Sequence, residues 1–334
     1  MVKGATTIDF PVRLTRHGAI IDDISRHTPR PGYAVAMRWS QADFPLVMKG
    51  FWLVNRATNI EEVETAAGYA KSGQNWIYAD DRGNIGFYFL GGIPRRVGFS
   101  GELPVPGWES AFEWQDYVPN REQPHLKNPA QGYIVNANNK VGPEGYPHII
   151  SKYYATPDRY IRIAEMIEEK ETLSSREFEI MQADQVMVTA SFRDAVAYLT
   201  EALGSDVSAW QWGQLHTLTI HHPFGLKSAL LGKVFDLGSF PADGSLFTVN
   251  PTYFKVSQSY EAQGGGASFR YIIDFKEMTN SRRILPGGIS GNVMSPHYDD
   301  QFTLWRSGEY RRFVLDRDAV EADARYRMVI SPTE

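Results

Sequence analysis

Residues 8–14 alternate between apolar and polar or turn residues. A period of two is typical of a strand with one buried face, so this stretch predicts a strand. The pair at 17–18 predicts a turn, after which residues 19–21 continue the strand. The apolar run at 33–39 predicts a further strand.

The clearest hairpin pattern lies between residues 75 and 91. Residues 76–79 and 85–90 are rich in aromatic and β-branched residues, and the polar stretch 80–84 between them predicts the turn. A long loop follows from 91 to 129, rich in Pro, Gly and Trp. Loops of this length are usually functional or cover a surface.

Two helix starts are predicted from capping-box spacing, a Ser or Thr followed three residues later by Glu. Thr58 with Glu61 predicts a helix after residue 58, and Ser174 with Glu177 predicts another after residue 174. Apolar spacing predicts that the second helical region continues to residue 203.

A third helix is predicted from Thr-Pro-Asp at 156–158, with Thr as N-cap and Pro at the first position, and it runs to about residue 170. An apolar segment lies at 215–220, and the segments 246–250 and 269–275 predict strands. Paired strands that alternate with paired helices indicate an α+β architecture. Because no stretch reads as a linker, we predict a single domain over residues 1–334.

The composition excludes several classes of protein. Hydrophobic residues make up 43% and charged residues 22% of the 334 residues, as in folded globular proteins. The net charge is −5 without a basic block, so nucleic acid is not expected as a partner. The absence of cysteine excludes thiolate metal sites, a cysteine nucleophile and disulfides. No apolar run reaches the ~20 residues of a membrane span, so no membrane partner is expected.

The stretch QGYIVNANNK at 131–140 is unusual, because the strand-like residues 133–135 run into Asn136, Asn138 and Asn139. Asparagine favours turns, where its side chain bonds the local backbone. Alternatively, an amide N–H at a strand end can stabilise a developing oxyanion. In a strand, Asn136 and Asn138 would point to the same side and Asn139 to the other.

Three other groups of residues carry side chains that can form sites. His216, His221 and His222 could bind a metal, but the spacing between them matches no known metal-site pattern. Gly264–Gly266 lacks the Gly-Lys-Ser/Thr sequence of a phosphate loop and is interpreted as a flexible loop. The HYDDQ group at 297–301 is either an acid–base group or a hydrogen-bonded loop anchor, and we favour the anchor.

Several segments resemble, in order, the β subunit of penicillin acylases and related N-acyl amidases, which are N-terminal-nucleophile hydrolases. The segments are NWIYADDRGNIGFYFLGGIPRR, ELPVPGW, GYIVNANN, ATPDRYIRI and LPGGISGNVMSPHYDDQFTLWRSGEYRRF. The resemblance implies an αββα layered fold, in which two stacked antiparallel sheets are flanked by helices. It also implies amide hydrolysis through an acyl-enzyme.

The resemblance also implies roles for individual residues. The nucleophile of the family is an N-terminal serine whose α-amino group acts as base, a role that suits an amine with a pKa near ~8. The oxyanion asparagine falls on Asn138, and the arginine that orients it falls on Arg159. Two acyl-pocket positions fall on Phe51 and Gln74. Gln74 replaces a more usual apolar residue, which argues against a strictly aromatic acyl preference.

The chain departs from the family pattern at its start, because Met1 aligns well inside the family's β subunit. The terminal serine, a second oxyanion donor and the α subunit would all lie upstream. We therefore expect an incomplete fold without the N-terminal strands, and no activity from the chain alone. The family's calcium site is also mostly upstream, and its late carboxylate ligand falls on Ile150, so we expect no metal and no cofactor.

The sequence thus predicts part of an N-acyl amide hydrolase that acts on small molecules such as β-lactams or acyl-homoserine lactones. Its partners would be the upstream β-subunit segment and the α subunit. The alternative is a stand-alone, truncated and non-catalytic relative that acts as a binding or interaction protein. The chain carries no signal that assigns a compartment.

Overall fold

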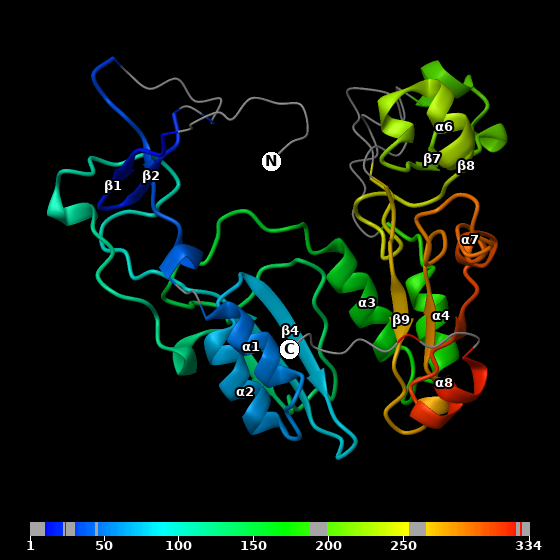
Figure 1. Cartoon of the computed structure of the whole chain (residues 1–334), viewed down its shortest axis with the longest axis horizontal. Coiled ribbons are helices and arrows are strands. Elements are labelled where there is room, and N and C mark those ends of the chain that lie inside the picture. The colour runs from blue at the N-terminus through cyan, green and yellow to red at the C-terminus, as the bar shows by residue number, and fades with distance from the viewer. Residues whose placement is uncertain are drawn as a thin grey trace. The chain divides into compact units, whose positions relative to one another are not determined.

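The computed structural model describes residues 11–22, 24, 31–43, 46–187, 199–253, 265–324 and 328. The chain forms two compact units (Figure 1). Unit 1 comprises Met1–Ile134 and Lys140–Tyr154, and unit 2 comprises Val135–Asn139 and Ala155–Glu334. The single domain over residues 1–334 stays a prediction.

Unit 1 contains two small three-stranded sheets and a pair of helices among its described residues. Its elements are β1 (Leu14–Thr15), β2 (Gly18–Ile20), β3 (Ala36–Met37), η1 (Ser40–Asp43), α1 (Val47–Val54), α2 (Ile60–Tyr69), β4 (Gln74–Ala79), β5 (Ile85–Leu90), η2 (Ser110–Phe112), η3 (Asn120–Glu122) and β6 (His125–Lys127).

The predicted hairpin is confirmed as β4 and β5, which pair in register from Gln74 with Leu90 to Ala79 with Ile85. The Asp80 carboxylate closes the turn by accepting the backbone N–H groups of Arg82 and Asn84. Such Asx bonds favour tight turns over continued strand. The long loop that follows returns to the sheet, where β6 pairs with β5.

The helices α1 and α2 pack on each other and on the hairpin. A Cβ added to Gly50 of α1 would lie only 2.5 Å from the Cβ of Ala70, so this close helix contact requires glycine. The buried face of α2 includes Ile60 and Val63, which join Tyr88 and Leu90 of β5 in one hydrophobic cluster. Helix α1 was not predicted.

Two predictions for the first part of the chain need correction. The N-cap of α2 is Asn59, one residue beyond the predicted Thr58, because the Asn59 side chain accepts the Glu62 N–H. The early strands are shorter than predicted: only 14–15, 18–20 and 36–37 are paired among the described residues. Residues 8–10 lie outside the described residues.

Unit 2 contains the remaining helices and strands. Its elements are α3 (Asp158–Glu168), α4 (Ser175–Gln182), η4 (Val207–Ala209), η5 (Trp212–Gln214), β7 (Thr217–Ile220), η6 (Gly225–Lys227), α6 (Ala229–Phe235), β8 (Leu237–Pro241), β9 (Arg270–Ile272), η7 (Met278–Asn280), β10 (Arg282–Ile284), α7 (Phe302–Arg306), β11 (Arg311–Arg312) and α8 (Arg317–Asp323).

The capping box at Ser174 and Glu177 is confirmed at the start of α4, where both reciprocal hydrogen bonds are present. The prediction that this helix continues to residue 203 is wrong, because α4 ends at Gln182. Asp184 takes part in ending it, since its carboxylate accepts the Val186 N–H. Residues 188–198 lie outside the described residues, and helix resumes at 199–203.

The third helix start is confirmed with a shift of one residue, because the N-cap of α3 is Pro157 and not Thr156. The strand predicted at 269–275 corresponds to the shorter β9, and the apolar segment at 215–220 contains β7. The strand predicted at 246–250 is wrong. There the Thr248 hydroxyl accepts the Ser245 N–H and donates to the Ser245 carbonyl, and such local bonds compete with a strand ladder.

The core of unit 2 joins β7, β8, β10 and α7. Leu218, Phe240 and Ile284 are buried together with Trp305 of α7. In Figure 1, β9 and α4 lie close together, and the Gln182 side chain donates to the Tyr271 carbonyl.

The mixture of helices and strands agrees with the predicted α+β class. Among the described residues the strands form three sheets of three strands and one of two. The layering of two large sheets, and the incompleteness of the fold, stay predictions. Within the same residues, no helix is both long and apolar enough to cross a membrane.

Candidate functional site

The asparagine-rich stretch forms a turn and not the predicted strand. Residues 133–136 have no strand partner among the described residues, and Asn138 adopts a left-handed backbone with φ of 62°. Asparagine is one of the few non-glycine residues that adopt this conformation readily. The prediction that Asn136 and Asn138 point to one side of a strand is therefore wrong.

Two of the three asparagines serve the local backbone. The Asn139 Oδ1 accepts the Ala137 N–H at 2.9 Å, and the Asn136 Oδ1 lies 3.4 Å from the Asn138 backbone nitrogen that donates to it. This is the turn interpretation, which the structure bears out for these two residues.

The third asparagine makes a different contact, with Arg159. The Arg159 Nη2 donates to the Asn138 Oδ1 at 2.9 Å, and the Ala155 N–H donates to the Asn138 carbonyl at 3.0 Å. Arg159 is the second residue of α3, so the helix backbone restricts where its guanidinium can reach. The structure thus brings together the two residues for which the family resemblance implies catalytic roles.

The chemical consequence is a fixed amide orientation. Because a cation holds the carbonyl oxygen of the Asn138 side chain, its Nδ2 group faces away from Arg159 as a donor. The nearby positive charge polarises the amide and strengthens that donor. Asn138 is exposed and Arg159 is partly buried.

The predicted acyl-pocket residues lie in unit 1. The Phe51 ring of α1 meets the Trp76 ring of β4 edge-on, with 5.5 Å between centroids. Gln74 and Trp76 alternate with Asn75 along β4, so their side chains share one face of the strand. Gln74 is exposed. The two pairs of predicted site residues thus belong to different units.

The three histidines make hydrogen bonds with other residues of unit 2. His216 is buried and bonds the Thr252 hydroxyl at 2.8 Å. His221 Nδ1 bonds the Asp236 carboxylate at 2.7 Å, and the His222 backbone N–H donates to the same carboxylate. Among the described residues no three His, Cys, Asp or Glu side chains gather as metal ligands would.

The group at 297–301 forms a loop anchor, as favoured. The Asp300 carboxylate accepts from Arg311 at 3.0 Å and contacts His297 at 3.2 Å. Gln301 is buried, and its side chain accepts the Leu285 N–H. Of the Gly264–Gly266 stretch, Gly265 has a positive φ of 93°, which suits a turn.

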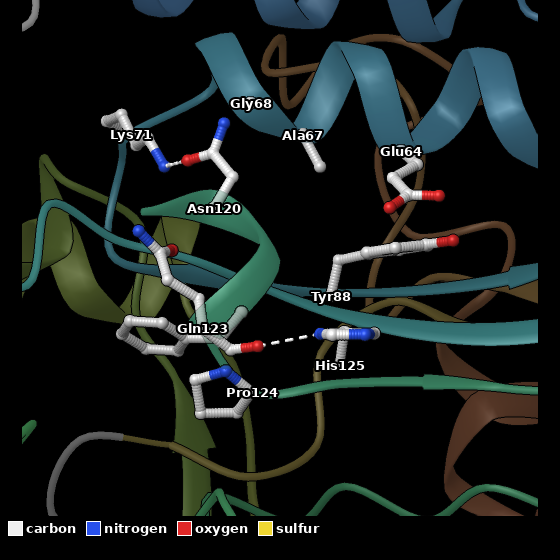
Figure 2. Close-up of a pocket in the computed structure, with 10 residues that line it drawn as sticks. Glu64, Ala67, Gly68, Lys71, Tyr88, Asn120, Gln123, Pro124 and His125 are labelled. Carbon is white, nitrogen blue, oxygen red and sulfur yellow. Dashed lines mark hydrogen bonds between the residues drawn. The ribbon is translucent and has the colours of Figure 1, made fainter. Parts of the chain in front are cut away.

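Sequence reasoning missed a small pocket of about 30 Å³ in unit 1, close to the volume of one water molecule (Figure 2). Lys71 lines it and is only 6% exposed, with its ammonium group donating to the Asn120 side chain. The Tyr88 hydroxyl is buried and has no hydrogen-bond partner among the described residues. Nothing in the sequence marks Lys71, because its burial depends on residues distant along the chain.

Burial changes the ionisation of this pocket. Removal from water lowers the pKa of Lys71 to about 8 and raises the pKa of Tyr88 to about 12, because both charged forms lose hydration. The described residues place no carboxylate within ion-pair distance of Lys71. The pocket therefore holds a weakly compensated cation.

The class of the protein follows from comparison with known families. The family model of penicillin amidase matches residues 1–191 and 183–322, so the chain belongs to the penicillin amidase family. This family includes acylase-type hydrolases, in agreement with the resemblance seen in the sequence.

Particular relatives share much of the chain at low identity. An acyl-homoserine lactone acylase QuiP of Pseudomonas syringae pv. syringae is 22% identical over 456 aligned residues, which cover 99% of this chain and 55% of the relative. Penicillin acylase 2 proenzyme of Pseudomonas sp. strain SE83 is 22% identical, and the alignment covers 97% of this chain and 54% of the relative. The chain thus spans about half the length of these relatives.

A solved structure supports the fold. The thermostable penicillin G acylase of Alcaligenes faecalis superimposes with a TM-score of 0.65 at 18% identity, covering 100% of this chain and 81% of that one. At this identity the likeness concerns the fold alone.

Proposed function

We propose that this chain supplies part of the active site of an N-acyl amide hydrolase. The observation that carries the proposal is the hydrogen bond from Arg159 to the Asn138 side chain. It orients a side-chain amide donor in the way that oxyanion stabilisation requires. Membership of the penicillin amidase family gives the reaction class.

In the proposed reaction a serine outside these 334 residues attacks the amide carbonyl, and its own α-amino group takes the proton. The carbonyl oxygen then becomes an oxyanion, which the Nδ2–H of Asn138 binds. Collapse of this intermediate expels the amine and leaves an acyl-serine, which water hydrolyses through a second oxyanion. Asn138 would serve both steps, and Arg159 would act as the positioning residue.

The acyl group would contact Phe51 and Trp76, whose edge-on pair offers an apolar surface. Gln74, on the same face as Trp76, adds a polar group to that surface. We therefore propose a substrate with an acyl group that is not strictly aromatic. The named relatives act on penicillins or acyl-homoserine lactones, and both are small N-acyl compounds.

Further polypeptide would complete the site. Oxyanion donors are most effective where water is excluded, and Asn138 is exposed in this chain. We propose that an upstream β-subunit segment and an α subunit cover it. The name "proenzyme" of one relative, which denotes a precursor, is in line with a multi-part enzyme.

The test expresses the chain both alone and together with the coding sequence that precedes it. Hydrolysis of a phenylacetyl anilide and of an acyl-homoserine lactone is then measured. The longer protein should turn over one of these substrates, and Asn138→Gly should lower kcat by about 10²–10³-fold. Glycine is chosen because it keeps the left-handed turn without strain and removes only the amide.

Asn136→Ala is the matched control, since its weak local contact predicts less than about a tenfold change. The proposal fails if Asn138→Gly retains full kcat. If the isolated chain hydrolyses amides and Asn138→Ala abolishes that activity, the proposal that the nucleophile lies outside these 334 residues is wrong.

A further inference from the structure

Unit 1 contains a second pocket, of about 170 Å³, apart from the one around Lys71. Its polar lining comes from Ser40, Gln41 and Arg96, and its apolar wall includes Phe89, Pro94 and Ile150. Neither Phe51 nor Gln74 lines it, although Gly73, the chain neighbour of Gln74, does. Its volume lies below the ~300–1,000 Å³ of drug-sized sites and suits a small ligand.

The Arg96 side chain is half-buried, with its Nε away from solvent. Its Nε is buried without a hydrogen-bond partner, and no carboxylate of the described residues lies within 4 Å of it. The acid of this region, Glu113, is already held by Arg16 at 2.8 Å and lies 4.0 Å from Arg38. Burial of a charged group without compensation is costly.

The guanidinium is nevertheless held in place. The Arg96 Cζ lies 5.1 Å from the centroid of the Trp114 ring, and the Cζ of Arg38 lies 4.8 Å from the same ring. Two cations on one aromatic ring further raise the local positive potential. Arg96 is thus pre-positioned, and its charge is not neutralised by the protein.

The pocket does not fit the calcium ion of the family. Ile150 occupies the position expected for a late carboxylate ligand, and it lines this pocket together with Arg96. No carboxylate residue lines the pocket, whereas Ca²⁺ takes six to eight oxygen ligands, carboxylates among them. An arginine at this position repels a cation.

We propose that this pocket binds a small organic carboxylate. The Arg96 guanidinium pairs with the carboxylate, because its planar fork matches two carboxylate oxygens. The Ser40 hydroxyl adds a further donor, and Phe89, Pro94 and Ile150 contact a ring or short alkyl chain. Such a ligand supplies the counter-charge that Arg96 lacks, and its apolar part contacts the apolar wall of the pocket. The proposal does not depend on the amidase reaction.

The test uses the full chain with sodium benzoate as the probe and benzamide as its uncharged counterpart. Binding is measured by calorimetric titration, and the midpoint of thermal unfolding provides a second readout, since a ligand of the native state raises it. Benzoate should bind at least about tenfold more tightly than benzamide, because only benzoate carries the charge. Benzoate should also raise the unfolding midpoint.

Two variants assign the effect to Arg96. Arg96→Met keeps an apolar chain over Trp114 and should weaken benzoate binding at least about tenfold, whereas Arg95→Met, an exposed neighbour, should leave it unchanged. If Arg96→Met fails to fold, Ile150→Trp fills the pocket without a change of charge and should also abolish binding.

The proposal is overturned if benzoate and benzamide bind equally, if benzoate does not bind, or if Arg96→Met retains the wild-type affinity. It is also overturned if Ca²⁺ raises the unfolding midpoint of the wild type and Arg96→Met does not alter that response. Each of these results would assign the pocket to another ligand or to none.

Discussion

Arg159 donates a hydrogen bond of 2.9 Å to the side-chain oxygen of Asn138, across 21 residues of sequence. The contact joins the first turn of α3 to a turn with left-handed backbone. Because Arg159 donates to the oxygen of the Asn138 side-chain amide, the amide nitrogen is the group that remains to contact a substrate. The contact therefore sets the polarity of the site as well as its shape.

Replacement of Arg159 should impair catalysis without unfolding the protein. In the active, upstream-extended protein we expect Arg159→Met to lower kcat by about 10–100-fold, because the Asn138 amide loses its fixed orientation. Arg159→Lys should recover part of this loss by restoring one charged donor. Steady-state kinetics on the phenylacetyl anilide measures both effects.

Arg162, one turn further along α3, provides the control. Its guanidinium pairs with Asp184 at 2.9 Å, a different residue from the Asn138 that Arg159 contacts. Arg162→Met should lower the free energy of unfolding and leave kcat nearly unchanged. Equal kcat losses in the two variants would contradict a specific role for Arg159.

Substitution at Gln74 should change the choice of acyl group. We expect Gln74→Ile to raise kcat/KM for phenylacetyl over linear acyl substrates by about 5–10-fold, because one polar side chain is exchanged for an apolar one beside Trp76. Asn75→Ala is the control, since its side chain lies on the other face of β4. A similar change of ratio in both variants would disprove an acyl contact at Gln74.

The stability of the protein should depend on Lys71 at alkaline pH. Its pKa falls from the ordinary 10.5 to about 8 in the folded state. Between these values the unfolded chain binds the extra proton, so the free energy of unfolding rises with pH. Below pH 8 the full cost of the buried charge is present, and above 10.5 it is gone. We expect this rise to amount to about 1–3 kcal/mol.

Lys71→Met should lack this rise. The free energies of unfolding of wild type and variant are measured by urea unfolding from pH 7 to 10.5. The difference between them gives the contribution of Lys71. Lys127→Met is a suitable comparison, because Lys127 donates a hydrogen bond to Glu61 that raises the pKa of Lys127. The contribution of Lys127 to the free energy of unfolding is therefore constant over this pH range and is lost only at higher pH. A pH-independent difference between wild type and Lys71→Met would show that the lysine ionises normally.

The parts of the fold that the sequence predicted are those with local causes. The capping box at Ser174 and Glu177 and the turn closed by Asp80 depend on bonds between residues a few positions apart. The pairing of Asn138 with Arg159 spans 21 residues, so no local pattern predicts it, and it was expected only from the motif resemblance.

The failures arose where side chains compete with the backbone ladder. Residues 246–250 and 133–135 are apolar enough for strands, but Thr248 and Asn139 offer the backbone other hydrogen bonds. Helix α1 was not predicted because Gly50 is unfavourable in a helix interior. The close contact with Ala70 that requires this glycine is visible only in the structure.

Buried charge could not be predicted either. The burial of Lys71 and the half-burial of Arg96 result from contacts with residues distant along the chain, such as Asn120 and Trp114. The lack of an acidic partner within the described residues is a property of the tertiary structure, and no periodic pattern reports it.

The path of the chain has a consequence for cleavage. Residues Val135–Asn139 belong to unit 2, the following Lys140–Tyr154 return to unit 1, and Ala155 bonds the Asn138 carbonyl. A protease that nicks the peptide within 140–154 would therefore produce two fragments that each retain a piece of the other's unit. Such fragments should stay associated under native conditions and separate only in denaturant, so a gel without denaturant would overlook the cut.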